Sequence, residues 1–339
     1  MKKLTYSLLP LGITVGLCLN ITPASASLMA RNVISNAALS IDGFGSLSNK
    51  GIIQANIPAG STIQRAYLYA ASVWNMSPVY GVTFHGNVLS RNSATILSPN
   101  NNPAETARWD VTNIIASSFT GGLQDFSIVE NGQNDGAVLV VAYSNSSTQG
   151  LTSVILDGEL STGGDTVQFD FDSPYTGGDF LVSLASSYSS QPSGQYTQID
   201  VTTNSTNNRR LSTSAGGQDD GEWVDVGGGA LMTVGGIGDD PTNPNPFASS
   251  SDPSAPRIDD EYYNLALGNS ASAAPFISPG DTFLRLTTQN PSNDDNVFGL
   301  FITSGFKISP APVPEPSMTL GIFGIGAIGI LLSRRGKKS

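Results

Sequence analysis

Short apolar segments alternate with polar, turn-forming segments along most of the chain. Residues 51–57 stop at a Pro-Ala-Gly turn, and a second apolar segment follows at 65–74. In residues 166–171, Val167, Phe169 and Phe171 alternate with polar residues, the period of two that predicts a strand with one buried face. Further strands are expected at residues 81–84, 126–129, 137–143, 152–156, 180–184, 196–201, 230–234, 283–288 and 297–306.

One segment differs, because residues 136–143 are apolar at nearly every position. This pattern is typical of a central strand that is covered on both faces. The sequence offers one short helix before the C-terminus, at 111–118, and no long amphipathic helical pattern. We therefore predict an all-β fold, an antiparallel β-sandwich or jelly roll, built as one large domain or as two packed sandwiches.

The N-terminus has the three parts of a secretory signal peptide. Lys2 and Lys3 precede an apolar stretch from 8 to 19, and small residues occupy positions 24 and 26. Residues 1–26 are therefore predicted to be a signal peptide that signal peptidase removes. Cys18 follows Leu17, where a lipoprotein signal needs a small residue. Without Cys18 the mature chain holds no cysteine and no disulfide.

The C-terminus also has three parts: a proline-rich linker at 310–317, an apolar segment at 318–332 and a basic tail at 333–339. A helix over 318–332 would be about 22 Å long, shorter than the hydrocarbon core of about 30 Å. It is expected to be transmembrane with its basic end in the cytoplasm. The residues of interest are Val313, Pro314, Glu315, Pro316, Ser317, Arg334 and Arg335.

These residues resemble the PEP-CTERM sorting signal of exported bacterial proteins. The resemblance implies that an exosortase recognises and removes the segment. It further implies delivery to the cell surface or to the extracellular polysaccharide matrix. A permanent membrane anchor is the alternative reading of the same segment.

The charge of the chain is negative and uneven. Sixteen basic residues face 27 acidic ones, a net charge of −11 with a pI near 4.4, which argues against a nucleic-acid partner. Loss of both ends takes away six basic residues and leaves a net charge of about −17. Most of the excess lies in 165–309, an acidic β-rich half that forms the same sandwich as 27–164 or a second one.

Composition removes several kinds of catalytic site. One cysteine and one histidine remove most ways of building a zinc site, a thiol nucleophile or a Ser-His-Asp triad. His85 is expected in a turn after a strand. A glycosidase would need two carboxylates about 5–9.5 Å apart. The available residues are Glu105, Glu130, Glu159, Glu222 and Glu261, with Trp74, Trp109 and Trp223 as sugar platforms.

Clusters of acidic residues in the second half suggest a calcium site. Calcium takes six to eight oxygen ligands and tolerates irregular loops. The candidate ligands are Asp259, Asp260, Asp294 and Asp295, and the alternative is that these residues are solvated turn formers. Trp223 has the most polar neighbourhood of the tryptophans and is the candidate carbohydrate contact.

The stretch 66–160, with its short β segments, resembles β-rich modules of bacterial surface and adhesion-type proteins, which implies a surface or matrix role. Together these features predict an exported, exosortase-processed, non-catalytic protein of the cell surface or extracellular matrix. Its expected partners are exopolysaccharide or other cell-surface components, with calcium as a candidate cofactor. Two alternatives stay open: a secreted polysaccharide-active enzyme and a passive structural protein of a sheath.

Overall fold

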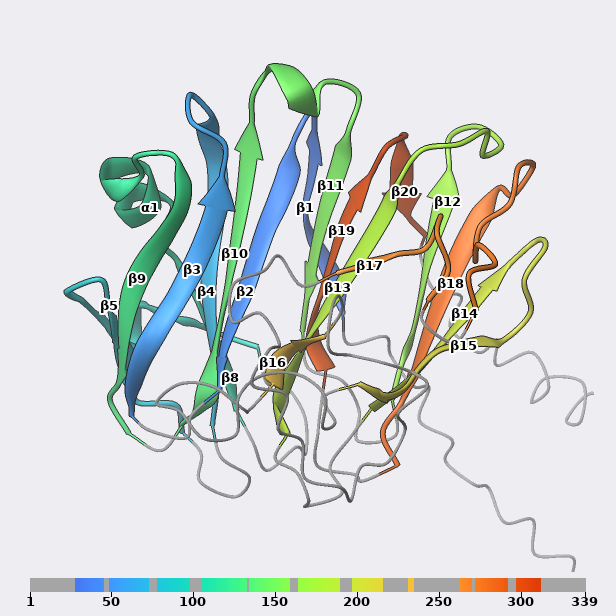
Figure 1. The fold of residues 1–339 in the computed structure, drawn as a ribbon. Helices are drawn as coiled ribbons and strands as arrows, with labels where there is room; N and C mark the ends of the chain where they lie inside the picture. The colour runs from blue at the N-terminus through green and yellow to red at the C-terminus, as the bar shows by residue number, and fades with distance from the viewer. Residues whose placement is uncertain are drawn as a thin grey trace, which may run out of the picture. The chain divides into compact units, whose positions relative to one another are not determined.

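The computed structural model describes residues 28–45, 49–72, 78–97, 105–132, 134–158, 164–189, 197–215, 231–234, 262–269, 272–291 and 297–311. These ranges consist mostly of antiparallel strands, which confirms the all-β expectation (Figure 1). The α-helix within them is α1 (Thr112–Ser118), close to the expected 111–118. None of the helices in the described ranges has the length and apolar character of a membrane span.

The first part of the chain builds two sheets, here called sheets B and C. Sheet B has the order β2 (Ala38–Gly45), β10 (Asn134–Ser144), β4 (Thr62–Ser72), β8 (Thr106–Asp110), β7 (Thr95–Ile96). Sheet C has the order β3 (Lys50–Ile57), β9 (Gly122–Glu130), β5 (Gly81–Phe84), β6 (Asn87–Ser90).

The second part builds sheets A and D, with one strand borrowed from the start of the chain. Sheet A has the order β1 (Met29–Ser35), β11 (Thr152–Asp157), β19 (Val297–Ser304), β13 (Phe180–Ser189), β16 (Leu231–Val234), and β17 (Tyr263–Asn264) pairs with β13. Sheet D has the order β15 (Arg209–Ala215), β14 (Thr197–Thr203), β18 (Phe283–Gln289), β12 (Thr166–Phe171), β20 (Ile308–Pro310).

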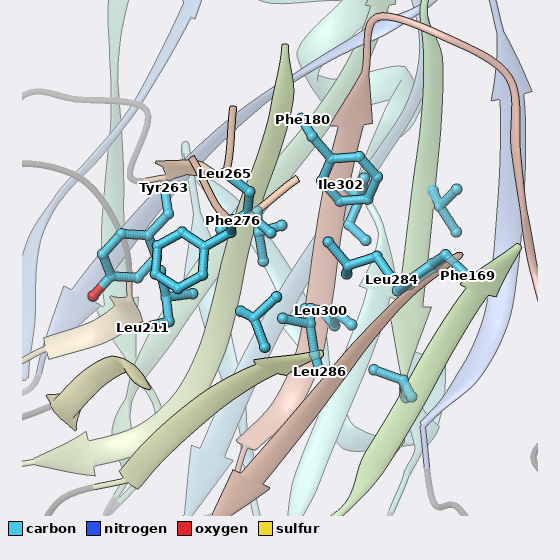
Figure 2. Close-up of a cluster of buried hydrophobic side chains, with 14 of the residues drawn as sticks. Phe169, Phe180, Leu211, Tyr263, Leu265, Phe276, Leu284, Leu286, Leu300 and Ile302 are labelled. Carbon is cyan, nitrogen blue, oxygen red and sulfur yellow. The ribbon is translucent and has the colours of Figure 1, made fainter. Parts of the chain in front are cut away.

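Each pair of sheets encloses an apolar core, as the two sheets of a sandwich do. Between sheets B and C, Leu68 and Leu139 pack with Ile53 and Phe126 in one cluster of buried residues. Between sheets A and D, the core contains Phe169 and side chains from neighbouring strands. Figure 2 shows them: Phe180, Leu211, Tyr263, Leu265, Phe276, Leu284, Leu286, Leu300 and Ile302.

A third core joins sheets A and B. It holds Tyr69 and Val140 of sheet B together with Ile155, Phe298 and Phe301 of sheet A. Strand β10 therefore contributes to two cores, with Leu139 facing one and Val140 the other. This confirms that the wholly apolar segment 136–143 is a central strand covered on both faces.

The first two strands of the chain lie in different sheets. Strand β1 pairs with β11 in sheet A, and β2 pairs with β10 in sheet B. The strands join at Asn36, whose φ of 56° is in the left-handed region. Its backbone N–H donates to Leu151 O at 2.7 Å, and its side-chain oxygen accepts from Gly150 N at 2.9 Å.

Some strands have the bounds expected from the sequence, and others begin or end at different residues or were not expected. Strands β5 and β12 match the expected segments 81–84 and 166–171. The strand expected at 65–74 is instead β4, which runs from 62 to 72. Strands β1, β8 and β15 were not expected, because polar residues interrupt their apolar pattern. Strand β2 was not expected either, although apolar and polar residues alternate in it from 39 to 42.

The expected division at residue 164 lies between β11 and β12. Strand β11, on the N-terminal side of this position, pairs with β1 and with β19, whose residues 297–304 come from the other side. The division into 27–164 and 165–309 stays a prediction about domains. The hydrogen-bonded sheets themselves draw on both segments.

Candidate functional site

Most residues singled out from the sequence lie outside the described residues. These are the sorting residues Val313, Pro314, Glu315, Pro316, Ser317, Arg334 and Arg335, the candidate calcium ligands Asp259, Asp260, Asp294 and Asp295, and the candidate sugar contact Trp223. The expected segments 1–26, 318–332 and 333–339 lie there too. Among the residues that the structure does describe, no three His, Cys, Asp or Glu side chains gather as a metal site.

Two candidates for sugar hydrolysis have contacts in the described part. Glu105 is 7% exposed and accepts from Val79 N at 3.0 Å and from the Arg91 guanidinium. Trp109 is 2% exposed in the core between sheets B and C, and its Nε1 donates to Ser90 O at 2.9 Å. Trp109 therefore offers no face on which a sugar ring could stack. Glu130 is also buried, and Glu159, Glu222, Glu261 and Trp74 lie outside the described residues.

His85 lies in the turn between β5 and β6, as expected. Its φ is 46°, and its backbone N–H donates to Ser127 O at 2.7 Å. The imidazole stands edge-on to Phe126, with 5.2 Å between ring centroids. These contacts position the turn over sheet C.

One buried carboxylate connects sheets A and B. Asp157, at the end of β11, has a fully buried side chain and forms ion pairs with Arg31 of β1 and Arg108 of β8. The hydroxyl of Tyr69 in β4 also donates to it, at 3.1 Å. The register of β1 against β11 shifts between Ala30 and Asn32, so Arg31 is the extra residue of a bulge.

This network changes the titration of its tyrosine and one arginine. Burial and the adjacent Asp157 carboxylate raise the pKa of Tyr69 well above its ordinary value of 10.0. Burial lowers the pKa of Arg108, but the charge of Asp157 and its hydrogen bond more than offset this, so the pKa is raised. The network ties the two sheets together.

A different surface has the properties of a binding site: the outer face of sheet D, opposite the core. Its residues belong to the four paired strands β12, β18, β14 and β15, and they occupy the alternate positions whose side chains point away from the core. Inward residues such as Phe169 and Leu284 are fully buried, and their neighbours along each strand are more exposed and, apart from Phe283, polar. We call this surface the polar face; it comprises Thr166, Gln168, Asp170, Gln198, Asp200, Thr202, Arg210, Phe283, Arg285, Thr287 and Gln289.

The centre of the polar face is a chain of hydrogen bonds between Arg285, Gln168 and Asp170. Gln168 and Arg285 lie opposite each other in the β12–β18 pair. The Arg285 guanidinium donates to Gln168 Oε1 from Nη2 at 2.8 Å and from Nε at 3.2 Å. Gln168 Nε2 in turn donates to Asp170 Oδ1 at 2.9 Å. Phe283 lies beside them, with its ring centroid 5.8 Å from Arg285 Cζ.

A second row of the polar face crosses the same strands. Asp200 accepts from Arg210 Nε at 2.6 Å and from Nη2 at 3.3 Å, a two-pronged ion pair that leaves Asp200 only 6% exposed. Thr287 of β18 lies opposite Asp200 of β14 and opposite Thr166 of β12. The two threonine hydroxyls are 3.3 Å apart. The face thus presents planar and hydroxyl groups at fixed positions.

The polar face was missed in the sequence because its strands are far apart along the chain. Gln168 and Arg285 are separated by 117 residues. A signal was present in each strand, since 166–170, 198–202 and 285–289 all carry polar residues at alternate positions. Only the pairing of these strands shows that the polar residues share one face.

Comparison with known proteins bears on the C-terminus. A model of the PEP-CTERM protein-sorting motif matches residues 312–335. The comparison with curated proteins finds no match for the chain. The chain therefore carries an exosortase-substrate sorting signal, which confirms the resemblance noted from Val313 to Ser317. This signal implies export and transient anchoring in the membrane through the C-terminal region.

Proposed function

We propose that this protein is a non-catalytic component of the cell surface or the extracellular matrix that associates with exopolysaccharide. The sorting motif at residues 312–335 carries the proposal, since it marks the chain for export and exosortase processing. The described body contains three apolar cores, and the chain has no cysteine outside the expected signal peptide. Its stability outside the cytoplasm therefore depends on these cores and not on disulfides. Calcium remains a candidate cofactor at Asp259, Asp260, Asp294 and Asp295.

The contacts of the described carboxylates favour binding over hydrolysis. Glu105 is held by Arg91, and Asp200 by Arg210. A glycosidase needs two carboxyl groups that reach the sugar, and these two are buried and engaged in ion pairs. A secreted polysaccharide-active enzyme stays the second candidate, and a passive sheath protein the third.

The first experiment determines location and ends. We expect the intact mass of the native protein, isolated from the envelope or medium, to correspond to a chain from Ser27 to near Pro316. In Glu315→Ala, within the matched motif, we expect the protein to keep its C-terminus and to accumulate in the inner membrane. Ser339→Ala, outside the matched residues, is the control and should be processed normally. Unchanged processing of Glu315→Ala, or a full-length C-terminus in the unaltered protein, would contradict exosortase processing.

The second experiment separates binding, hydrolysis and passive structure. The processed protein is incubated with polysaccharide from its own cells, and both co-sedimentation and newly formed reducing ends are measured. Co-sedimentation without new reducing ends is the expected result. Release of reducing ends would favour the enzyme, and absence of co-sedimentation would favour the sheath protein.

A further inference from the structure

We propose that the polar face of sheet D is the polysaccharide-binding surface and that it takes an uncharged, hydroxyl-rich chain. This inference rests on the proposed function and goes beyond it by assigning the surface and the chemical class of the ligand. Three properties of the face carry it: unused donors, local neutrality and a fixed arrangement of planar groups.

The donors are on Arg285 and Gln168. A guanidinium has five N–H groups, and the hydrogen bonds of Arg285 within the described part of the chain use two of them. Gln168 Nε2 has two N–H groups, of which one donates to Asp170. Both side chains lie on the solvent side of sheet D, so the remaining donors face outward. Sugar hydroxyls can accept from these donors and can themselves donate to Asp170 and the threonine hydroxyls.

The charges of the face cancel. Arg210 is paired with Asp200, and the positive charge of Arg285 is balanced by Asp170 through Gln168. This neutrality contrasts with the acidic composition of the surrounding half, with 18 acidic and five basic residues in 165–310. An acidic polymer would be repelled by that half. An uncharged polymer meets no such repulsion, and the local charge pattern therefore favours it.

The arrangement is rigid before any ligand arrives. Two hydrogen bonds join Arg285 to Gln168 across two paired strands and restrict both side chains, and the core side chains beneath, Phe169 and Leu284, are fully buried. Binding then costs little side-chain entropy, which is the usual loss when polar surfaces associate. The half-buried ring of Phe283 adds an apolar surface beside these donors, against which the C–H face of a sugar can pack. A protein partner is less well matched, because aspartate is depleted in protein interfaces and the centre of this face carries Asp170.

The test is affinity electrophoresis. The processed protein, purified from the cells that produce it, migrates through native gels that contain a dissolved polymer, and binding to the polymer slows its migration. The probes are the cells' own polysaccharide, hydroxyethylcellulose and dextran as uncharged polymers, and polygalacturonate as an acidic one. The variants are Arg285→Gln and Gln168→Ala, with Arg65→Gln as control. Arg65 is also an exposed strand arginine, but it lies on β4 and pairs with Asp110.

We expect the cells' own polysaccharide and at least one uncharged polymer to retard the unaltered protein. Arg285→Gln should weaken this binding about tenfold, the effect of losing a charged hydrogen-bond donor. Gln168→Ala should act in the same direction, and Arg65→Gln should bind as the unaltered protein does. Equal thermal melts of all variants would show that folding is intact.

Failure of the surface and failure of the function give different results. If the own polysaccharide is bound equally by all variants, the polar face is not the binding surface and the proposed function stands. Retardation by polygalacturonate alone would overturn the uncharged class of ligand. If the own polysaccharide is not bound at all, both the proposed function and the assigned surface are wrong.

Discussion

Asp157 is the residue on which the junction of sheets A and B depends. Its carboxylate is fully buried and accepts from two guanidinium groups and one phenol, supplied by the three strands β1, β8 and β4. A buried carboxylate is stable only when its charge and its lone pairs are satisfied, and this set of donors satisfies both. The same burial keeps Tyr69 protonated, because a phenolate there would face the carboxylate without water.

The raised pKa of Tyr69 predicts a loss of stability in alkaline solution. Since the folded state favours the protonated phenol, its contribution is complete below pH 10 and decreases as the pH rises further. At pH 8 we expect Tyr69→Phe to be less stable by about 1–2 kcal/mol, the effect of one lost hydrogen bond to a charged group. Above pH 10 this difference should shrink by about 1.4 kcal/mol per pH unit.

Urea titrations of both proteins at pH 8, 10 and 11 measure this difference. The comparison removes the effects of Tyr67 and Tyr175, whose raised pKa values are common to both proteins. Parallel dependence of the two free energies of unfolding on pH would show that Tyr69 titrates normally.

At the level of elements, the turn between β1 and β2 sends the chain from one sheet to another. Asn36 has a positive φ, which a residue with a Cβ adopts at a cost of about 1–2 kcal/mol. Its side chain also accepts from Gly150 N, and its carbonyl accepts from the Thr148 hydroxyl at 2.6 Å. The turn is thereby fixed to the loop that leads into β11, the partner of β1.

Two substitutions at Asn36 separate backbone strain from hydrogen bonding. Asn36→Ala loses the side-chain acceptor and puts a residue with less tolerance of positive φ at this position, so we expect a destabilisation of about 2 kcal/mol. Asn36→Gly loses only the acceptor, because glycine adopts positive φ freely, and should cost about 1 kcal/mol. Thermal or urea unfolding gives both values. A glycine variant less stable than the alanine variant would contradict this reading of the turn.

The elements also show how far sequence reasoning reaches. Strands with strict alternation or a wholly apolar stretch, such as β12 and β10, could be predicted because each strand carries the signal by itself. Strand β2 was not expected, although Leu39 and Ile41 alternate with polar residues there. The alternation gives no sign that the polar residues Ser40 and Asp42 are buried as well. In the fold these two side chains accept from Asn56 N and Gln54 N of β3, so their burial depends on a strand in another sheet.

The same distinction applies to the candidate sites. The PEP-CTERM motif is a linear signal within residues 312–335 and was recognisable from the residues alone. The polar face depends on the pairing of β12 with β18 and of β18 with β14, which no local pattern specifies. Gly164, at the expected division between the two halves, has a φ of 96°, and a Cβ there would lie 2.1 Å from Thr288 O. Its role is close packing at the start of β12.

At the level of the whole described body, two pairs of sheets share a third core. Tyr69 of sheet B packs with Phe298 and Phe301 of sheet A, at ring-centroid distances of 5.9 Å in both cases. Strand β1 adds a covalent link, because the chain enters through sheet A before it forms sheets B and C. Each large apolar side chain buried in this core stabilises it by about 1.5–3 kcal/mol. We therefore expect the two sheet pairs to unfold together.

Asp157→Asn tests this coupling, with Asp172→Asn as the matched control. The first substitution leaves Arg31 and Arg108 without their counter-charge in a mostly buried place, and we expect a loss of about 3 kcal/mol. Asp172 forms an exposed ion pair with Lys307, so its replacement should cost less than about 1 kcal/mol. Urea unfolding is measured in a Trp74→Phe/Trp223→Phe background, which leaves Trp109 as the one tryptophan of the chain, and is followed by tryptophan fluorescence and by far-ultraviolet circular dichroism. Coincident transitions are expected in the unaltered protein, because Trp109 reports one core and the dichroism reports every strand. Separate transitions in the unaltered protein would mean that the sheet pairs unfold independently, and equal losses in the two variants would mean that Asp157 does not hold them together.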